Sequence, residues 1–205
     1  MFNNLSQNRA ILIVALLNFS YFFVEFFIAL DITSVSLFAD SIDFLEDAFT
    51  NFIILFGLYL SLQNRIKLGY LLIGMILIPS LFTLIFAINQ FLNPVLTDGV
   101  LLSSYALGAL VINIFCAFLI AKFKKANNSL LLTAFYSARN DALANIAMII
   151  AGGITLYTTS HYPDLIVGIL IFLLNLDASK AIYEQIKKER NESRIFRVKR
   201  KGKIW

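Results

Sequence analysis

Six long apolar runs dominate this sequence, and they restrict the fold more than any other feature. Each is long enough to cross a bilayer, since roughly 20 apolar residues span a hydrocarbon core about 30 Å thick. The predicted spans are Ala10–Leu30, Ser34–Leu62, Leu68–Phe91, Val100–Ala121, Leu130–Tyr157 and Leu165–Ile182. We therefore expect an all-α polytopic integral membrane protein of six transmembrane helices, with neighbouring helices antiparallel because their connections are short.

The composition agrees with a membrane environment. Of the 205 residues, 59% are hydrophobic and 15% charged, whereas roughly 25% of residues are charged in soluble domains. The run that begins at Ala10 is too long and bulky for the apolar region of a cleaved signal peptide. We therefore expect residues 1–182 to form one six-helix transmembrane domain.

Basic residues gather on one side of the predicted membrane. Sixteen of the 17 Lys and Arg residues flank the ends of spans that face this side. They are Arg9, Arg65, Lys67, Lys122, Lys124, Lys125 and ten residues between Lys180 and Lys203. Because cytoplasmic loops hold the excess of positive charge, both termini are predicted to be cytoplasmic, in a bacterial-type inner (plasma) membrane.

Residues 183–205 form a basic cytoplasmic tail in this interpretation. The electrostatic attraction of one basic residue to an anionic membrane surface is worth about 1 kcal/mol. We therefore expect the tail to be attracted to lipid headgroups. Nucleic acid is a poorer partner, because the basic run is short and tethered to the membrane.

Ionisable residues inside the spans are the informative exceptions. A charge at the bilayer centre costs at least about 2.5–3.5 kcal/mol, so such a residue is expected to face the bundle interior, pair with another charge or line an ion path. The residues concerned are Glu25, Asp40, Asp43, Glu46, Asp47, Arg139, Asp141 and Asp177.

Helical spacing arranges some of these residues into two oxygen-rich stripes. Asp40, Asp43 and Asp47 share one face of the second span, and Ser137 and Asp141 share a face of the fifth. Oxygen atoms from two facing helices could hold a divalent cation. Because clustered carboxylates repel one another unless protons or a cation intervene, metal binding would displace protons, as in a cation/proton antiporter.

The remaining ionisable residues have structural alternatives. Asp40 is either a polar lining residue or a ligand, and Glu46 and Arg139 are interpreted as structural ion-pair partners. Asp177 is spaced to pair with Lys180. Asn51 and Asn145 are candidates for lining residues. The sequence shows no nucleophile–base arrangement or metal-hydrolase motif, and so no enzyme is predicted.

Two stretches carry a family resemblance. The segment SVSLFADSIDFLEDAFTNFIILFGLYLS, with ligand positions at Asp43 and Asp47, resembles the second transmembrane helix of the cation diffusion facilitator family. The segment YSARNDALAN, with Asp141, resembles its fifth helix, and Asp164 opens the sixth. The resemblance implies a homodimeric exporter of divalent transition metals in exchange for protons. It implies metal ligation by Asp43, Asp47 and Asp141, with Ser137 as a weaker fourth ligand.

The sequence departs from the family pattern in three ways, and the first affects the expected substrate. Ser137 stands where the family commonly has His, so the ligand set holds only oxygen, which favours harder ions such as Mn²⁺ or Mg²⁺ over Zn²⁺. The loop after the second span has no histidines, and no counterpart of the family's C-terminal cytoplasmic domain is expected. No resident cofactor is predicted; the transported substrate is a divalent cation such as Mn²⁺, Fe²⁺, Co²⁺ or Zn²⁺.

Two other functions stay open at this point. The chain could be a non-transporting relative that acts as a membrane partner of a full-length transporter. It could instead move another solute, such as an organic cation or protons alone, along the acidic stripe. Metal binding and metal-dependent transport distinguish these alternatives from the exporter.

Overall fold

Six helices account for nearly all of the described chain. The computed structural model describes residues 6–57, 62–121 and 129–201; the side chains of some helical positions, among them 129–137 and 188–201, are outside the described part. The helices are α1 (Gln7–Asp31), α2 (Val35–Gly57), α3 (Leu62–Leu92), α4 (Gly99–Ala121), α5 (Ser129–Thr158) and α6 (Tyr162–Lys201). Each overlaps one predicted span, which confirms the all-α, six-helix fold.

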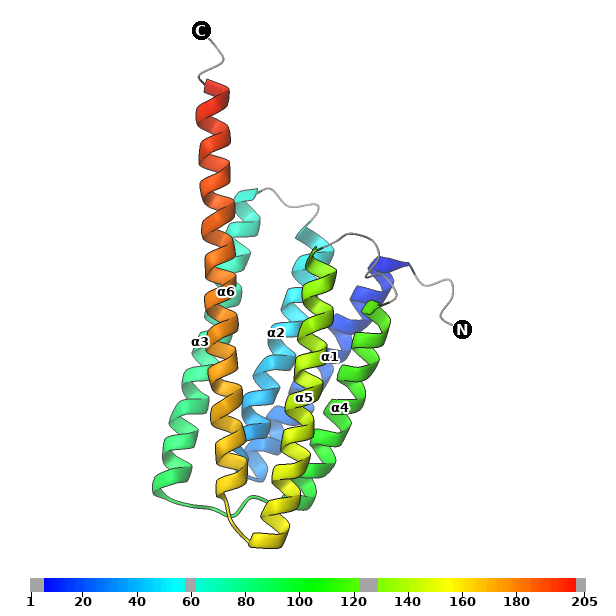
Figure 1. Ribbon diagram of the computed structural model, residues 1–205, viewed down its shortest axis with the longest axis vertical. Coiled ribbons are helices and arrows are strands. Elements are labelled where there is room, and N and C mark those ends of the chain that lie inside the picture. The colour runs from blue at the N-terminus through cyan, green and yellow to red at the C-terminus, as the bar shows by residue number, and fades with distance from the viewer. Residues whose placement is uncertain (1–5, 58–61, 122–128, 202–205) are drawn as a thin grey trace.

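The helices form an antiparallel bundle (Figure 1). α1 packs along α2, α4 along α5, and α3 along α6, while α2 also contacts α3, α5 and α6. The start of α1 and the end of α6 lie at the same end of the bundle. An even number of antiparallel helices brings both termini to one end of the bundle, where most of the Lys and Arg residues also lie in the sequence. We call it the inner end, and the opposite end the outer end.

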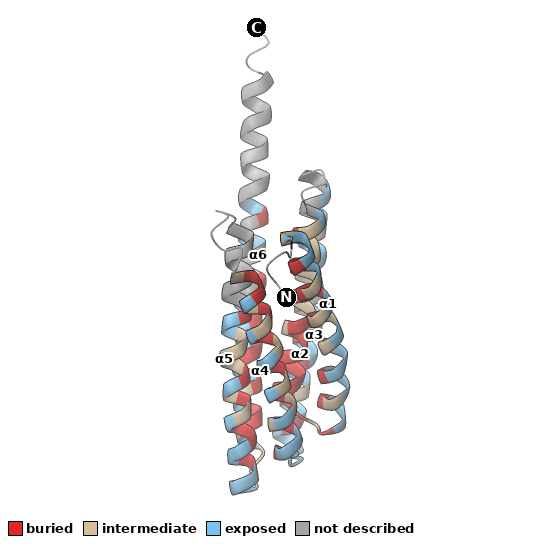
Figure 2. Cartoon of the chain, turned by 90° about the vertical axis from the view of Figure 1, so that its right-hand side faces the viewer, coloured by how far each residue is buried: buried red, intermediate tan, exposed pale blue. Residues whose placement is uncertain are grey.

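The outer surface of the bundle is largely apolar. Large hydrophobic side chains such as Phe27, Phe82, Val111 and Phe118 are well exposed, and Figure 2 shows exposed positions along the outward faces of the helices. By length and composition, α1, α4 and Ala138–Thr158 of α5 could each cross a membrane. α2 is excluded from that group because four acidic residues lie within its 23 residues, and these residues face inward.

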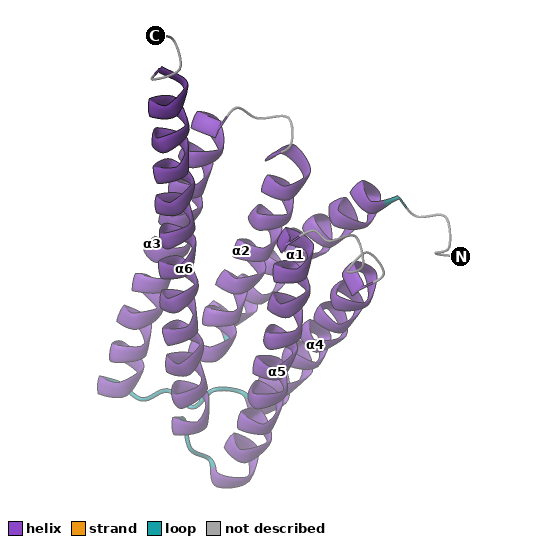
Figure 3. Cartoon of the chain, turned by 45° about the horizontal axis from the view of Figure 1, so that its top comes forward, coloured by secondary structure: helices purple, strands orange, loops and turns teal. Residues whose placement is uncertain are grey.

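α6 is much longer than its predicted span, which ended at Ile182. It runs without interruption through 40 residues to Lys201, and Figures 1 and 3 show it projecting beyond the other helices at the inner end. At 1.5 Å per residue, a helix of this length measures about 60 Å, twice the thickness of a bilayer core. The basic tail therefore begins as a continuation of α6.

At the outer end, one carboxylate ties α6 to the start of α2. Asp164 is fully buried and accepts hydrogen bonds from Ser34 Oγ at 2.7 Å, Val35 N at 2.8 Å and Ser36 N at 3.1 Å. Thr97, between α3 and α4, donates a further bond at 3.2 Å. The first amides of a helix have no partner within the helix, so Asp164 fixes α2 by satisfying two of them.

Candidate metal transport site

A cavity of about 240 Å³ lies between α2, α5 and α6. Five of its lining residues carry a carboxyl group and two carry an amide. The lining residues are Asp43, Glu46, Asp47, Asn140, Asp141, Ala144, Leu174, Asn175 and Asp177. The cavity therefore concentrates oxygen atoms from three helices within an otherwise apolar bundle.

α2 contributes three of the carboxyl groups to this cavity. Asp43 and Asp47 are one helical turn apart on the same face, and Glu46 lies beside them. Asp47 is 7% exposed, and Asn18 of α1 donates a hydrogen bond to its Oδ2 at 3.5 Å. Asn51 Nδ2 donates to the backbone oxygen of Asp47 at 2.7 Å, so amide groups orient this part of α2.

α5 brings Asp141 to the same cavity. The structure therefore unites Asp43, Asp47 and Asp141, the three carboxylates that the sequence singled out. Ser137, the fourth predicted ligand, belongs to α5, but its side chain is outside the described part. Asn145, one turn after Asp141, is fully buried, and neither of its side-chain polar atoms has a hydrogen-bond partner among the described residues.

α6 supplies lining residues that the sequence analysis did not assign to the site. Asn175 is 3% exposed, and its side chain lines the cavity together with Asp177. Asp177 had been interpreted as a surface partner of Lys180; it is exposed but borders the cavity. The available signal was that Asn175 interrupts the apolar run from Leu165 to Leu176.

The carboxyl groups surround the cavity rather than converging on one point. Among the described residues, no three His, Cys, Asp or Glu side chains approach closely enough to enclose an ion by themselves. The carboxyls of Asp43, Glu46, Asp47 and Asp141 nevertheless interact electrostatically. Like charges in a buried site destabilise one another unless protons or a cation neutralise them, so the cavity suits positively charged species.

Arg139 is predicted to be a structural ion-pair partner, with Glu46 as one candidate. Its side chain is exposed and donates a hydrogen bond to the Asn140 side chain at 3.2 Å. Glu46 instead lines the cavity. Glu46 therefore adds a further carboxyl group to the site, and its pairing with Arg139 stays a prediction.

A second pair of acidic residues lies outside the cavity lining. Glu25 of α1 and Asp40 of α2 are both fully buried, and their carboxyl groups face each other. None of their four carboxyl oxygens has a hydrogen-bond partner among the described residues. Asp40 is therefore a buried residue close to Glu25 and does not line the cavity that holds Asp43.

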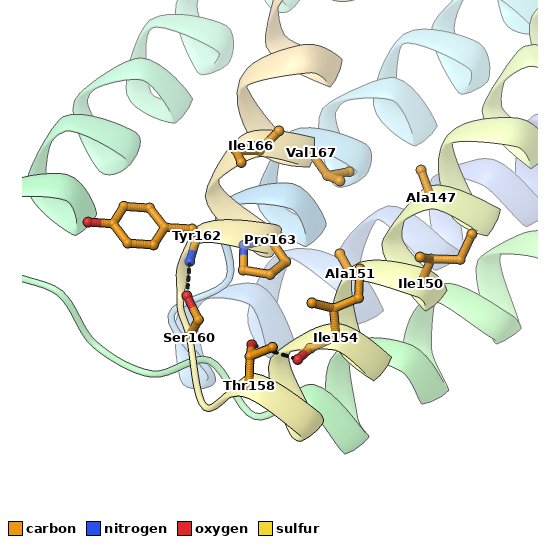
Figure 4. Close-up of a pocket in the computed structure, with 10 residues that line it drawn as sticks. All are labelled: Ala147, Ile150, Ala151, Ile154, Thr158, Ser160, Tyr162, Pro163, Ile166 and Val167. Atoms are coloured by element: carbon orange, nitrogen blue, oxygen red, sulfur yellow. Dashed lines mark hydrogen bonds between the residues drawn. The ribbon is translucent and has the colours of Figure 1, made fainter.

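Another pocket opens between α5 and α6 near the outer end (Figure 4). It measures about 550 Å³ and is lined largely by aliphatic side chains, including Ile150, Ile154 and Ile166. Thr158 and Ser160 lie at its outer edge, but their hydroxyls bond to Ile154 O and Tyr162 N. No carboxylate is among the residues that line this pocket, so it is not a candidate metal site.

Comparison with known proteins agrees with this geometry. A protein-family model described as the cation efflux transmembrane domain matches residues 11–185. The search of curated proteins gave no match. The matched region includes α2 to α5 in full, most of α1, the first 24 residues of α6 and every residue that lines the acidic cavity. The six helices are therefore the transmembrane helices of a membrane protein, and the chain belongs to the cation efflux (cation diffusion facilitator) family of metal transporters.

Proposed function

We propose that this protein exports a divalent metal cation in exchange for protons, through the cavity between α2, α5 and α6. The observation that carries the proposal is that Asp43, Asp47 and Asp141 line one cavity, although Asp141 is almost a hundred residues away from the other two along the chain. The three carboxylates are the principal ligands, with Ser137 as a weaker fourth. The same groups take up protons when the metal leaves.

The donor atoms indicate the class of metal. Carboxylate and hydroxyl oxygens suit Mn²⁺ and Mg²⁺, whereas imidazole and thiolate groups suit Zn²⁺. The lone histidine, His161, lies before the outer start of α6, and Cys116 is buried in α4 and donates to Asn18 at 3.8 Å. Neither lines the cavity. We therefore propose a preference for Mn²⁺ over Zn²⁺.

The remaining elements of the proposal come from the family and from the charge distribution. We propose a homodimer in the inner membrane, with the basic inner end in the cytoplasm and metal moving outward. The outward apolar faces of the helices supply the surface for lipid and for a second copy.

Transport by purified protein in liposomes that contain a metal-sensitive dye tests this function. We expect Mn²⁺ movement that requires a pH gradient, and a loss of at least about tenfold in Asp47→Asn and Asp141→Asn, because each removes a charged ligand. Asp31→Asn is the control, since Asp31 is exposed at the end of α1 and should transport normally.

Other results would favour the other functions. Folded protein that neither binds nor moves any divalent metal would overturn the proposal and favour a partner of another transporter. Movement of protons or of an organic cation that is insensitive to every divalent metal would favour a different solute.

A further inference from the structure

The acidic cavity has a third wall, on α6, and one side chain of that wall has the burial and chemistry of a ligand. Asn175 is 3% exposed, and its neighbours Ile171 and Phe172 are buried in the apolar bundle. Its amide nitrogen has no hydrogen-bond partner among the described residues. A buried amide N–H needs an acceptor, which the neighbouring carboxyl group of Asp43 can supply; the amide oxygen is then the atom that could meet a cation.

The other polar residues of the cavity wall differ from Asn175. Asn140 is exposed, and its amide oxygen already accepts a bond from Arg139. Asp177 is exposed as well. Among the lining residues, Asn175 is thus the one that is polar, uncharged and buried. Its amide lies beside the carboxyl group of Asp43. An ion that approaches Asp43 also approaches Asn175.

We propose that Asn175 is a ligand of the transported ion, so that the ion is held by α2, α5 and α6 together. This inference rests on the proposed function of the cavity. The amide oxygen would ligate the ion while the amide nitrogen donates to Asp43. Amide oxygens are common ligands of hard cations that prefer six or more oxygen atoms. A neutral ligand also completes coordination without adding to the repulsion among the carboxylates.

Participation of α6 has a consequence for specificity. The site without Asn175 offers three carboxylates and a hydroxyl, all from α2 and α5. An additional amide oxygen favours ions of higher coordination number, such as Mn²⁺, over tetrahedral Zn²⁺. Asn175 therefore acts on the ranking of ions as well as on affinity.

Equilibrium binding of Mn²⁺ and Zn²⁺ to the purified full-length protein in detergent tests the inference. We expect Asn175→Ala to weaken Mn²⁺ binding at least about tenfold and Zn²⁺ binding much less, because the lost oxygen matters most to the ion with more ligands. Asn175→Asp keeps an oxygen of similar reach and should restore Mn²⁺ binding. Ser179→Ala is the matched control, since Ser179 is equally buried one turn further along α6 and does not line the cavity.

The outcomes separate this inference from the proposed function. If Asp47→Asn abolishes Mn²⁺ binding while Asn175→Ala binds both ions as the wild type does, Asn175 is no ligand and the proposed function stands. If Asp47→Asn also binds normally, the cavity is not the metal site and both ideas fail. Should Asn175→Ala not fold, Asn175→Leu decides, because it keeps the size of the side chain without the oxygen: selective loss of Mn²⁺ binding supports ligation, and wild-type binding of both ions overturns it.

Discussion

The carboxylate of Asp164 accepts a hydrogen bond of 2.7 Å from the hydroxyl of Ser34, a residue 130 positions earlier in the chain. The same carboxylate bonds the backbone amides of Val35 and Ser36. It thereby holds the outer end of α2, whose middle carries Asp43 and Asp47, against the outer end of α6. The position of the candidate metal site relative to α6 depends on this contact.

We expect Asp164→Ala to destabilise the protein by about 3 kcal/mol or more, because several buried donors lose a charged acceptor at once. The melting temperature in detergent measures the change. Asp98→Ala is the control: Asp98 is exposed and caps only its own helix, α4, so its loss should cost about 1 kcal/mol. Equal effects of the two substitutions would contradict a special role of Asp164 in holding the bundle.

The close packing of α6 against α2 predicts that a larger side chain at Gly168 destabilises the protein. A Cβ atom added at Gly168 would lie 2.6 Å from Val35 Cγ1 and 2.7 Å from Ser36 N. Because backbone atoms cannot move aside cheaply, we expect Gly168→Ala to destabilise by about 1–3 kcal/mol. Gly153 of α5 has no atom within 4 Å of an added Cβ, so Gly153→Ala should instead gain up to about 1 kcal/mol from helix propensity. A higher melting temperature for Gly168→Ala would contradict this packing.

Replacement of Ser137 by His predicts a change of substrate. An imidazole at this position adds the nitrogen ligand that Zn²⁺ prefers, one turn from Asp141. We expect Ser137→His to raise the affinity for Zn²⁺ relative to Mn²⁺ at least about tenfold, measured by competition between the two ions. Ser129→His, two turns closer to the inner end, is the control and should keep the wild-type ranking. An unchanged ranking in Ser137→His would remove Ser137 from the site.

Glu25 and Asp40 give a prediction about stability. Both are buried and face each other, with no hydrogen-bond donor of another described residue beside them, and two neighbouring buried carboxyl groups disfavour each other's charged form. We expect the double substitution Glu25→Gln and Asp40→Asn to leave the melting temperature unchanged or to raise it by a few degrees, at about 2–4 °C per kcal/mol. The Ala/Ala variant should melt lower, because it leaves a void. A lower melting temperature for the amide variant would contradict this and show that the carboxyl pair stabilises the fold.

The fold was largely predictable from the sequence because the membrane makes apolar length decisive. α1, α4 and α5 begin and end within a few residues of their predicted bounds. α6 was the exception, since hydropathy shows only where a helix leaves the lipid. Residues such as Glu184, Gln185 and Lys187 are good helix formers, so the helix continues into water through the basic segment.

The candidate site was predictable in part, and the reason is geometric. Residues four apart on one helix must share a face, so Asp43 and Asp47 could be grouped by spacing alone. That Asp141 lines the same cavity depends on how α5 packs against α2, which spacing does not determine; the family resemblance supplied it. Asn175 was missed because a single amide in an apolar run has no periodic partner, and its orientation depends on the rotation of α6.

Because α6 is one continuous helix, a tilt about one end moves positions along it by amounts that grow with their distance from that end. About 55 Å of helix separates Asp164 at one end from Lys201 at the other, at 1.5 Å per residue, with Asn175 about 17 Å from the Asp164 end. If the helix tilts about its anchored outer end, a rotation of roughly 5° shifts Asn175 by about 1.5 Å and the far end by about 5 Å. The displacement at the Lys201 end would thus be about three times that at Asn175, and distance probes on the basic extension could record it.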